Sequence, residues 1–184
     1  MTSADTAGLG PAEMLGELER RARASAGRPV VLVDGGSGSG KTTVGAALAA
    51  ALGATLVRLD DMYPGWDGLQ QASSAVAAVV LARHRVPRWD WTSNRPKDVL
   101  TVDPRRPLVV EGSGSLSAAN RAMATFGIWI DLAEDERKRR ALQRDGEAYA
   151  LHWERWAAQE RAFFARERPD LLADVRVDGR LLLE

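Results

Sequence analysis

The chain has 184 residues, which fits a single domain, and 45% of them are hydrophobic, enough to form a substantial core. Its 25 Lys and Arg residues balance its 25 Asp and Glu residues, so no excess positive charge is available to neutralise a nucleic-acid backbone or an anionic membrane. The sequence contains no cysteine, which excludes disulfides, thiolate metal sites and cysteine nucleophiles.

Long apolar runs are also missing from the sequence. Residues 1–28 contain no continuous apolar segment of the kind found in signal peptides, and no run approaches the roughly 18 apolar residues of a membrane span. We therefore expect one soluble, cytoplasmic domain over residues 1–184, with a frayed terminus at residues 1–10. No membrane or nucleic-acid partner is expected, and the choice between monomer and homo-oligomer stays open.

The first predicted element is an amphipathic helix that begins at Pro11 and ends before Gly27, because apolar residues recur at helical spacing between them. Residues 30–33 form an apolar, mostly β-branched run, which is typical of a strand buried on both faces of a parallel sheet. A glycine-rich turn over residues 35–40 then leads into an alanine-rich helix over residues 41–52.

The alternation of strand and helix continues along the chain. Further strands are predicted at residues 55–59, 108–110, 127–130 and 175–177, and helical patterns at residues 73–83, 117–124, 134–144 and 147–166. This order predicts an α/β fold, with a five-stranded parallel sheet that carries helices on both faces. The stretch 86–104, with three prolines and two tryptophans, is predicted to be an irregular segment, of the kind that is usually functional or mobile.

A phosphate-binding motif lies at the junction of the first predicted strand and the following helix. Residues 35–42 read GGSGSGKT and satisfy the pattern G-x4-G-K-[ST]. Glycines let backbone N–H groups approach the β-phosphate, and the helix N-terminus adds partial positive charge. Lys41 is then expected to bridge β- and γ-phosphate oxygens, and Thr42 to hold Mg²⁺. The predicted ligands are ATP and Mg²⁺, bound by Gly35, Gly36, Ser37, Gly38, Ser39, Gly40, Lys41, Thr42 and Thr43.

Acidic residues follow two more of the predicted strands. Asp60 and Asp61 come at the end of the second strand, and Glu111 ends the third. Because ligands of open α/β sheets bind beyond the carboxyl ends of the strands, these carboxylates should share a rim with the phosphate-binding loop. The two aspartates could instead cap a turn or helix, and Glu111 could only hydrogen-bond the loop. Asp34, just before the loop, could assist Mg²⁺ or simply begin the turn.

These motifs together resemble the uridine kinase-like branch of P-loop small-molecule kinases, which includes phosphoribulokinase and pantothenate kinase. The matching segments are residues 35–43, 60–63, 109–112 and 140–145. The resemblance implies a P-loop fold and transfer of the γ-phosphoryl group of ATP to a hydroxyl group of a small molecule. In that family the first acid after strand two is the catalytic base, which matches Asp60, and the acid closing strand three helps to hold Mg²⁺, which matches Glu111.

The same resemblance implies a lid-like segment over residues 137–152. The family's lid arginines match Arg140 and Arg144, and Arg137 lies one turn earlier on the same helix face. Phosphoryl transfer needs mobile positive charge on the transferred oxygens, so we expect Arg140 and Arg144 to be catalytic, together with Lys41 and Asp60, and Arg137 to contact the nucleotide. An exposed helix whose arginines pair with its own glutamates would show the same pattern.

Aromatic and charged residues gather where such kinases bind the phosphate acceptor. With Asp60 and Asp61, the expected acceptor-binding residues are Tyr63, Trp66, Arg88, Trp89, Asp90 and Trp91. A ring could stack on a base while Asp90 accepts hydrogen bonds from ribose hydroxyls, which favours a nucleoside such as uridine or cytidine. Alternatively, the two tryptophans beside Asp90 only fix a long loop to the core.

Three functions therefore remain open: a nucleoside kinase, a kinase of a pantothenate-like, sugar or other metabolite, and a non-catalytic nucleotide-sensing module. A GTPase switch is disfavoured because the chain lacks the guanine-reading pattern N-K-x-D. The predicted helix over residues 147–166 carries an aromatic stripe of Tyr149, His152, Trp153, Trp156 and Phe163, which the spacing assigns to the core.

Overall fold

A five-stranded parallel sheet forms the centre of the computed structural model, which describes residues 9–182, with the backbone only at residues 147 and 148. The strand order is β2-β5-β1-β6-β7, and every pairing is parallel. The strands are β1 (Val30–Gly35), β2 (Thr55–Arg58), β5 (Leu108–Glu111), β6 (Phe126–Asp131) and β7 (Val175–Asp178). The predicted α/β class and its five strands are confirmed.

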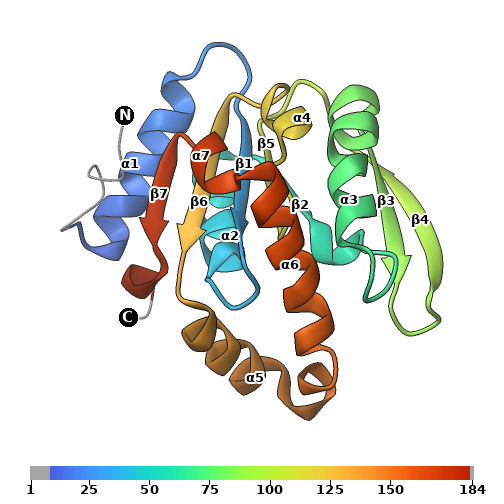
Figure 1. Cartoon of the computed structure of the whole chain (residues 1–184). Coiled ribbons are helices and arrows are strands. Elements are labelled where there is room, and N and C mark those ends of the chain that lie inside the picture. The colour runs from blue at the N-terminus through green and yellow to red at the C-terminus, as the bar shows by residue number, and fades with distance from the viewer. Residues whose placement is uncertain (1–8, 183–184) are drawn as a thin grey trace.

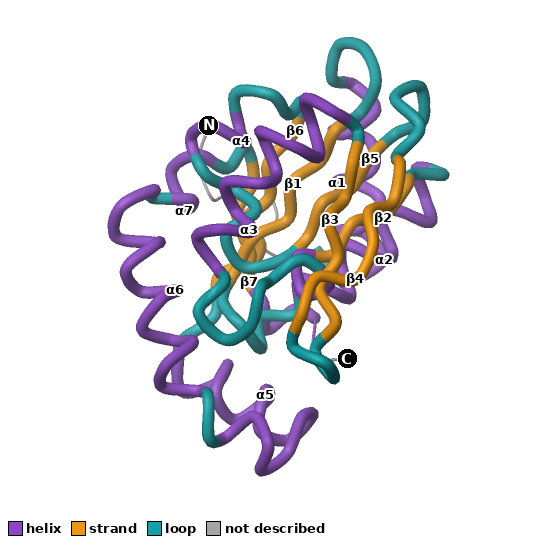
Figure 2. The backbone as a smooth tube through the Cα atoms, turned by 90° about the vertical axis from the view of Figure 1, so that its right-hand side faces the viewer, coloured by secondary structure: helices purple, strands orange, loops and turns teal. Residues whose placement is uncertain are grey.

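Helices cover both faces of this sheet, as Figures 1 and 2 show. One face carries α1 (Pro11–Ala24) and α2 (Lys41–Leu52), and the other carries α3 (Leu69–Ala75), α4 (Ala118–Arg121) and α6 (Trp153–Glu167). Side chains of β1 alternate between the two layers: Val30 and Leu32 join one core cluster, whereas Val31 and Val33 join the other. Burial on both faces is the reason why residues 30–33 of this strand are all apolar.

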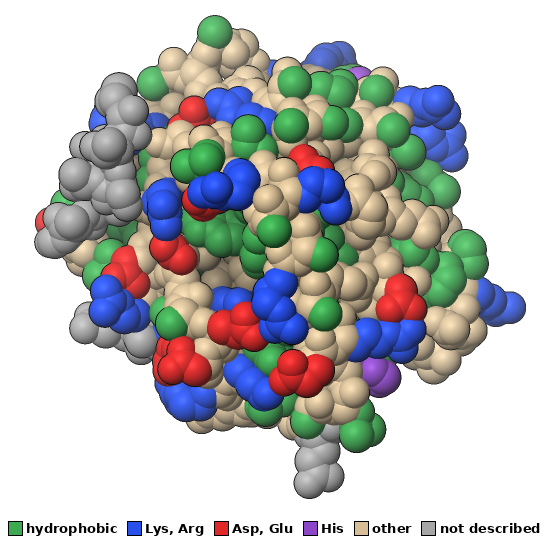
Figure 3. Space-filling model, in the orientation of Figure 1, with side chains coloured by type: hydrophobic (Ala, Val, Ile, Leu, Met, Phe, Trp, Pro, Cys, Tyr) green, Lys and Arg blue, Asp and Glu red, His purple; other side chains and the backbone are tan. Residues whose placement is uncertain are grey.

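The helix α5 (Glu134–Ala150) lies across the carboxyl ends of the strands (Figure 1). It is kinked at Gly146, which has a φ of 70°. The helix predicted over residues 147–166 is therefore divided, because residues 147–150 end α5 and α6 begins at Trp153. Acidic and basic side chains are interspersed over the molecular face in Figure 3. The ion pairs of α5 include Lys138 with Glu154 of α6 at 2.7 Å and Arg139 with Glu136 of the same helix at 2.5 Å.

The stretch predicted to be irregular folds into a β-hairpin instead. Strands β3 (Arg85–Asp90) and β4 (Arg95–Thr101) pair antiparallel as a separate two-stranded sheet. Each strand has a free edge, so its proline can be accommodated without loss of a ladder hydrogen bond. All residues of β4 are exposed, which removes the hydrophobic alternation by which a strand is recognised in a sequence.

Two predicted helices differ from the observed ones around Asn120. The helix predicted at residues 73–83 begins earlier, as α3, and continues as a π-helix, η2 (Val76–Leu81). The Asn120 amide enters this helix, accepting from the Ala77 N–H at 3.0 Å and donating to the Ser73 carbonyl at 3.1 Å. An inserted side chain that replaces the regular ladder accounts for the π-turn. The helix predicted at residues 117–124 is shorter than expected, because only residues 118–121 form α4.

The remaining elements are short: η1 (Leu59–Asp61), α7 (Pro169–Leu172) and η3 (Gly179–Leu182). Of the terminus predicted to fray, residues 1–8 lie outside the described residues, whereas Gly10 caps α1 and its N–H donates to Glu13 Oε2 at 3.0 Å. No helix between residues 9 and 182 is both long and apolar enough to cross a membrane.

Candidate active site

The glycine-rich loop joins β1 to α2 at the carboxyl edge of the sheet and is tightly covered by α5. Gly38 has a φ of +84°, and a Cβ atom there would lie 2.2 Å from the Arg137 carbonyl oxygen. At Gly36 a Cβ atom would lie 2.1 Å from Arg137 Nη1. The glycines therefore serve two purposes, because they permit the backbone conformation and also leave room for α5 to pack on the loop.

The first two residues of α2, Lys41 and Thr42, carry the polar side chains of the phosphate-binding motif. Lys41 is buried, and its Nζ donates weakly to the Gly36 carbonyl at 3.4 Å. The Thr42 hydroxyl donates to Glu111 Oε2 at 3.4 Å. The N–H of Thr43 donates to the Gly40 carbonyl within the helix start.

The pair of Thr42 and Glu111 fits a magnesium ion. Glu111 is 1% exposed, and its Oε1 has no hydrogen-bond partner among the described residues, although Arg58 Nε lies 3.8 Å away. Burial raises the pKa of the Glu111 carboxyl. The positive charge of Lys41 partly lowers this pKa, and the negative charge of Asp60 raises it further. A hydroxyl and a carboxylate with a free oxygen are the hard donors that Mg²⁺ takes beside phosphate oxygens, usually with only one or two carboxylates. The described residues hold no group of three acidic, histidine or cysteine side chains that could bind a metal ion by themselves.

A cavity of about 530 Å³ brings together residues from distant parts of the sequence. Polar residues on its walls include Lys41 and Thr42 from the phosphate-binding motif and Asp60 from η1, which directly follows β2. Of the predicted acceptor-binding residues, Asp60, Tyr63, Trp66 and Trp91 line it; Asp61 is exposed beside Asp60 and does not. Its full lining is Ser37, Lys41, Thr42, Asp60, Tyr63, Trp66, Trp91, Ser113, Arg144, Asp145, Tyr149 and Trp156.

Aromatic rings make up much of the cavity wall. Trp66 lies at the centre of the group: its ring stacks on His152 with centroids 4.2 Å apart and contacts Trp91 edge-on at 5.1 Å. Tyr149 and Trp156 line the cavity and also belong to core clusters, as predicted for the stripe, whereas His152 is only half-buried. Trp153 and Phe163 are 1% exposed and do belong to the core. The cavity wall therefore takes Tyr149 from α5 and Trp156 from α6.

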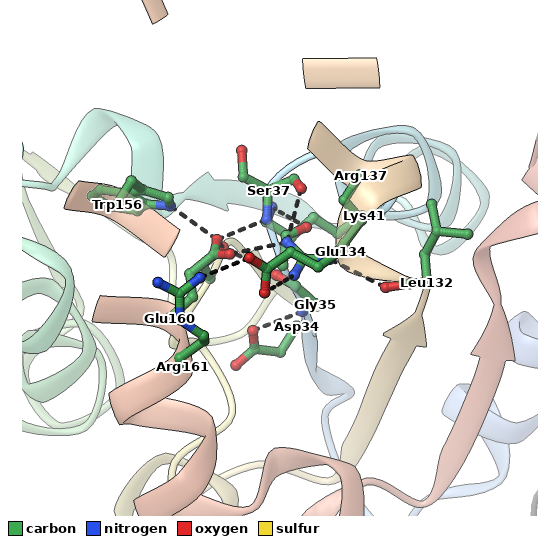
Figure 4. Close-up of polar contacts among 12 residues, drawn as sticks. Asp34, Gly35, Ser37, Lys41, Leu132, Glu134, Arg137, Trp156, Glu160 and Arg161 are labelled. Atoms are coloured by element: carbon green, nitrogen blue, oxygen red, sulfur yellow. Dashed lines mark hydrogen bonds and ion pairs between the residues drawn. The ribbon is translucent and has the colours of Figure 1, made fainter. Parts of the chain in front are cut away.

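The three predicted lid arginines have different surroundings. Arg137 is buried, donates to the Ser37 carbonyl at 3.2 Å and pairs with Glu160 at 3.0 Å (Figure 4). Arg140 donates to the Gly179 carbonyl at 3.2 Å and pairs with Glu136 on its own helix at 3.3 Å. Only Arg144 of the three lines the cavity, where it pairs with the adjacent Asp145 at 2.6 Å.

Arg88, Trp89 and Asp90, predicted to bind the acceptor, are not brought into the cavity. Arg88 forms an ion pair across the hairpin with Asp98 at 2.6 Å. Asp90 closes the hairpin turn, accepting from the Thr92 N–H at 3.0 Å and the Ser93 hydroxyl at 2.6 Å. The lone member of this segment at the cavity is Trp91, whose Nε1 donates to the Asp60 carbonyl at 2.8 Å.

Two buried acids, Asp34 and Glu160, accept hydrogen bonds from backbone N–H groups of the loop. Asp34 accepts from the N–H groups of Gly35 at 2.7 Å, Gly114 at 3.1 Å and Leu116 at 2.8 Å, so it begins the turn and ties it to the segment after β5. Burial raises the pKa of Asp34 to about 7. The second acid, Glu160, was not predicted from the sequence. The one feature of the sequence that could have indicated Glu160 is its position as a charged residue on the otherwise apolar face of α6.

Comparison with known proteins shows a likeness of fold. A structure described as a "possible uridine kinase" from Bacillus stearothermophilus superposes with a TM-score of 0.62 at 19% identity, covering 91% of this chain and 98% of that chain. A "putative fructose transport system kinase" from Silicibacter sp. TM1040 gives a TM-score of 0.58 at 24% identity, covering 92% and 99%. No protein-family model and no curated protein matches. The P-loop fold implied by the motifs is therefore confirmed: over nearly its whole length, this chain has the fold of those two structures.

Proposed function

We propose that the chain is an ATP- and Mg²⁺-dependent phosphotransferase that moves the γ-phosphoryl group of ATP onto a hydroxyl group of a small molecule. One observation carries the proposal: Lys41 and Thr42 of the phosphate-binding loop face the same cavity as Asp60. A phosphate donor bound at the loop and an alcohol beside Asp60 would therefore share one space. A volume of about 530 Å³ suits a small-molecule ligand.

The proposed roles follow from the chemistry of each group. The loop amides and Lys41 bind the phosphates, and Asp60 takes the proton of the acceptor hydroxyl as its oxygen forms a bond to the γ-phosphorus. The bond from that phosphorus to the bridging oxygen breaks, and ADP leaves. Arg144, which lines the cavity, would neutralise charge on the transferred oxygens. Mg²⁺, held by Thr42 and Glu111, would supply charge neutralisation at the phosphates.

The aromatic wall supports a nucleoside as the acceptor. Tyr63, Trp66, Trp91, Tyr149 and Trp156 present apolar ring surface on which a planar base can pack. A ribose hydroxyl would then face Asp60. A sugar or pantothenate-like acceptor remains the second candidate, since one of the two similar structures is described as a fructose transport system kinase and the bonds of Asp90 within the hairpin remove one expected ribose contact.

The acceptor is tested by measuring ADP release with a panel of nucleosides, sugars and pantothenate-like alcohols. The test of chemistry is Asp60→Asn, with Asp61→Asn as its matched control, because the adjacent aspartate does not line the cavity. We expect Asp60→Asn to lower kcat by about 100- to 10,000-fold with ADP affinity retained, and Asp61→Asn to change kcat by less than about threefold. Wild-type protein that binds ATP yet phosphorylates no alcohol would support a nucleotide sensor and refute the proposal.

A further inference from the structure

The carboxylate of Glu160 lies inside the molecule and contacts three distant chain segments (Figure 4). Glu160 is only 1% exposed to solvent. Oε1 accepts from the Ser37 N–H at 2.7 Å, the Ser113 hydroxyl at 2.8 Å and Trp156 Nε1 at 2.9 Å, and Oε2 accepts from Arg137 Nη1 at 3.0 Å. Burial of a carboxylate is costly unless it is paired and hydrogen-bonded, and here both conditions are met.

A charge at this position is not required by the packing of α6. Neighbouring residues on the same helix face, Trp156 and Phe163, are apolar and belong to the main core cluster. An apolar residue in place of a buried ion pair is often neutral or stabilising for a protein. The role of Glu160 therefore lies in the groups that it contacts rather than in the stability of the helix.

These contacts converge on Ser37 in the phosphate-binding loop. Its N–H donates to Glu160, its carbonyl accepts from Arg137 at 3.2 Å, and its Oγ accepts from the Tyr149 hydroxyl at 2.7 Å. The three partners belong to α5 and α6, so each polar group of Ser37 is bonded from outside the loop. Ser37 itself lines the cavity beside Lys41.

Glycines flank this serine on both sides and would leave an unanchored loop with many conformations. A loop whose amides must point toward a phosphate group binds more tightly when its geometry is fixed beforehand, because less conformational entropy is lost on binding. We propose that Glu160 is a positioning residue for nucleotide binding: together with Arg137 and Tyr149 it fixes Ser37 and thereby holds the phosphate-binding loop ready for the nucleotide. The inference rests on the proposed function only in requiring that the loop binds a nucleotide.

The test is the Kd of ADP, measured by isothermal titration calorimetry, for Glu160→Gln and for Glu154→Gln as matched control. Glutamine keeps the size of the side chain but loses the charge facing Arg137 and one acceptor oxygen. Glu154 is on the same helix, and its side chain is 71% exposed. We expect Glu160→Gln to raise the Kd on the order of tenfold, and Glu154→Gln to leave it unchanged within about twofold.

A double-mutant cycle distinguishes positioning from general stability. Tyr149→Phe and Ser37→Ala remove the same hydrogen bond, so the double variant should bind ADP no more weakly than the weaker single variant. Glu160→Gln acts through the backbone N–H of residue 37, so its effect should persist in the Ser37→Ala background.

Several outcomes would overturn the inference. A Glu160→Gln protein with a lower Tm but an unchanged ADP Kd, measured where it is folded, would show that Glu160 only supports packing. If that variant does not fold, an unchanged Kd for Tyr149→Phe would contradict the inference in its place. Wild-type protein that binds no ADP would instead refute the proposed function, and this inference with it.

Discussion

The phosphate-binding loop and the hairpin β3–β4 both contribute residues to one cavity, but the polar side chains of the two regions make different kinds of contact. Around the loop, Asp34, Ser37 and Glu160 are buried, and each bonds to an element far away in the sequence. In the hairpin, Arg88 and Asp90 bond to residues of the same hairpin, and Trp91 reaches outward to Asp60. The loop, where we propose that the nucleotide binds, is thus built into the core, whereas the hairpin, proposed to border the acceptor, can change at little cost to the fold.

The largest expected effect compares two glycines with similar backbone angles. Gly38, in the loop, has a φ of +84°, and a Cβ there would meet the Arg137 carbonyl oxygen at 2.2 Å; Gly65, on the acceptor side, has a φ of +75°, and its nearest atom would be 3.5 Å away. We expect Gly38→Ala to lower the free energy of unfolding by about 2–4 kcal/mol and Gly65→Ala by about 1 kcal/mol, measured by urea denaturation. Equal effects would contradict the claim that only the loop side is tightly packed.

The second prediction concerns the pH dependence of stability on the nucleotide side. Burial raises the pKa of Asp34 to about 7, above its ordinary value, so its contribution to stability is greatest below about pH 4 and is lost as the pH rises through 7. Asparagine does not titrate. The free energy of unfolding at about pH 5 minus that at about pH 8 should therefore be smaller in Asp34→Asn than in the wild type. An unchanged difference would show that Asp34 is ionised throughout this range.

The third prediction tests the link from the hairpin to Asp60. Trp91→Phe keeps a ring beside Trp66 but removes the N–H that donates to the Asp60 carbonyl at 2.8 Å. The lost hydrogen bond should contribute about 1 kcal/mol to holding Asp60 in place, so kcat should fall roughly five- to tenfold while the Kd of ADP stays unchanged. Trp89→Phe is the control, because its buried Nε1 has no hydrogen-bond partner among the described residues. The proposed link fails if both variants lower kcat equally.

The smallest effect is expected for Arg88→Ala. The Arg88 side chain pairs with the half-exposed Asp98, and solvent screens this ion pair, so its loss should change stability little. The KM of the acceptor should stay within about twofold of the wild-type value. A KM raised by about tenfold, measured by ADP release, would mean that Arg88 reaches the acceptor as the sequence motif suggested and that the hairpin moves on binding.

Much of the nucleotide side could be predicted because its signals are contiguous. Residues 35–42 form a single motif, and Asp60 and Glu111 end strands whose parallel arrangement follows from the strand and helix order. The hairpin could not be predicted for two reasons. Neither face of β4 is buried, so its sequence shows no hydrophobic alternation, and Pro87 and Pro96 are residues that usually argue against a strand. The bond from Ser37 to Glu160 spans 123 positions, and no local pattern encodes a contact at that separation.

By itself the sequence determined the α/β class, the five strands, the phosphate-binding loop and the acids at the strand ends, because periodicity and short motifs act over neighbouring residues. Tertiary structure alone decided which rings of α6 face the cavity, which arginine of α5 reaches it, and that a buried glutamate bonds to the loop. These outcomes depend on how α5 and α6 pack across the sheet edge, where burial and pairing of distant charges outweigh local preference.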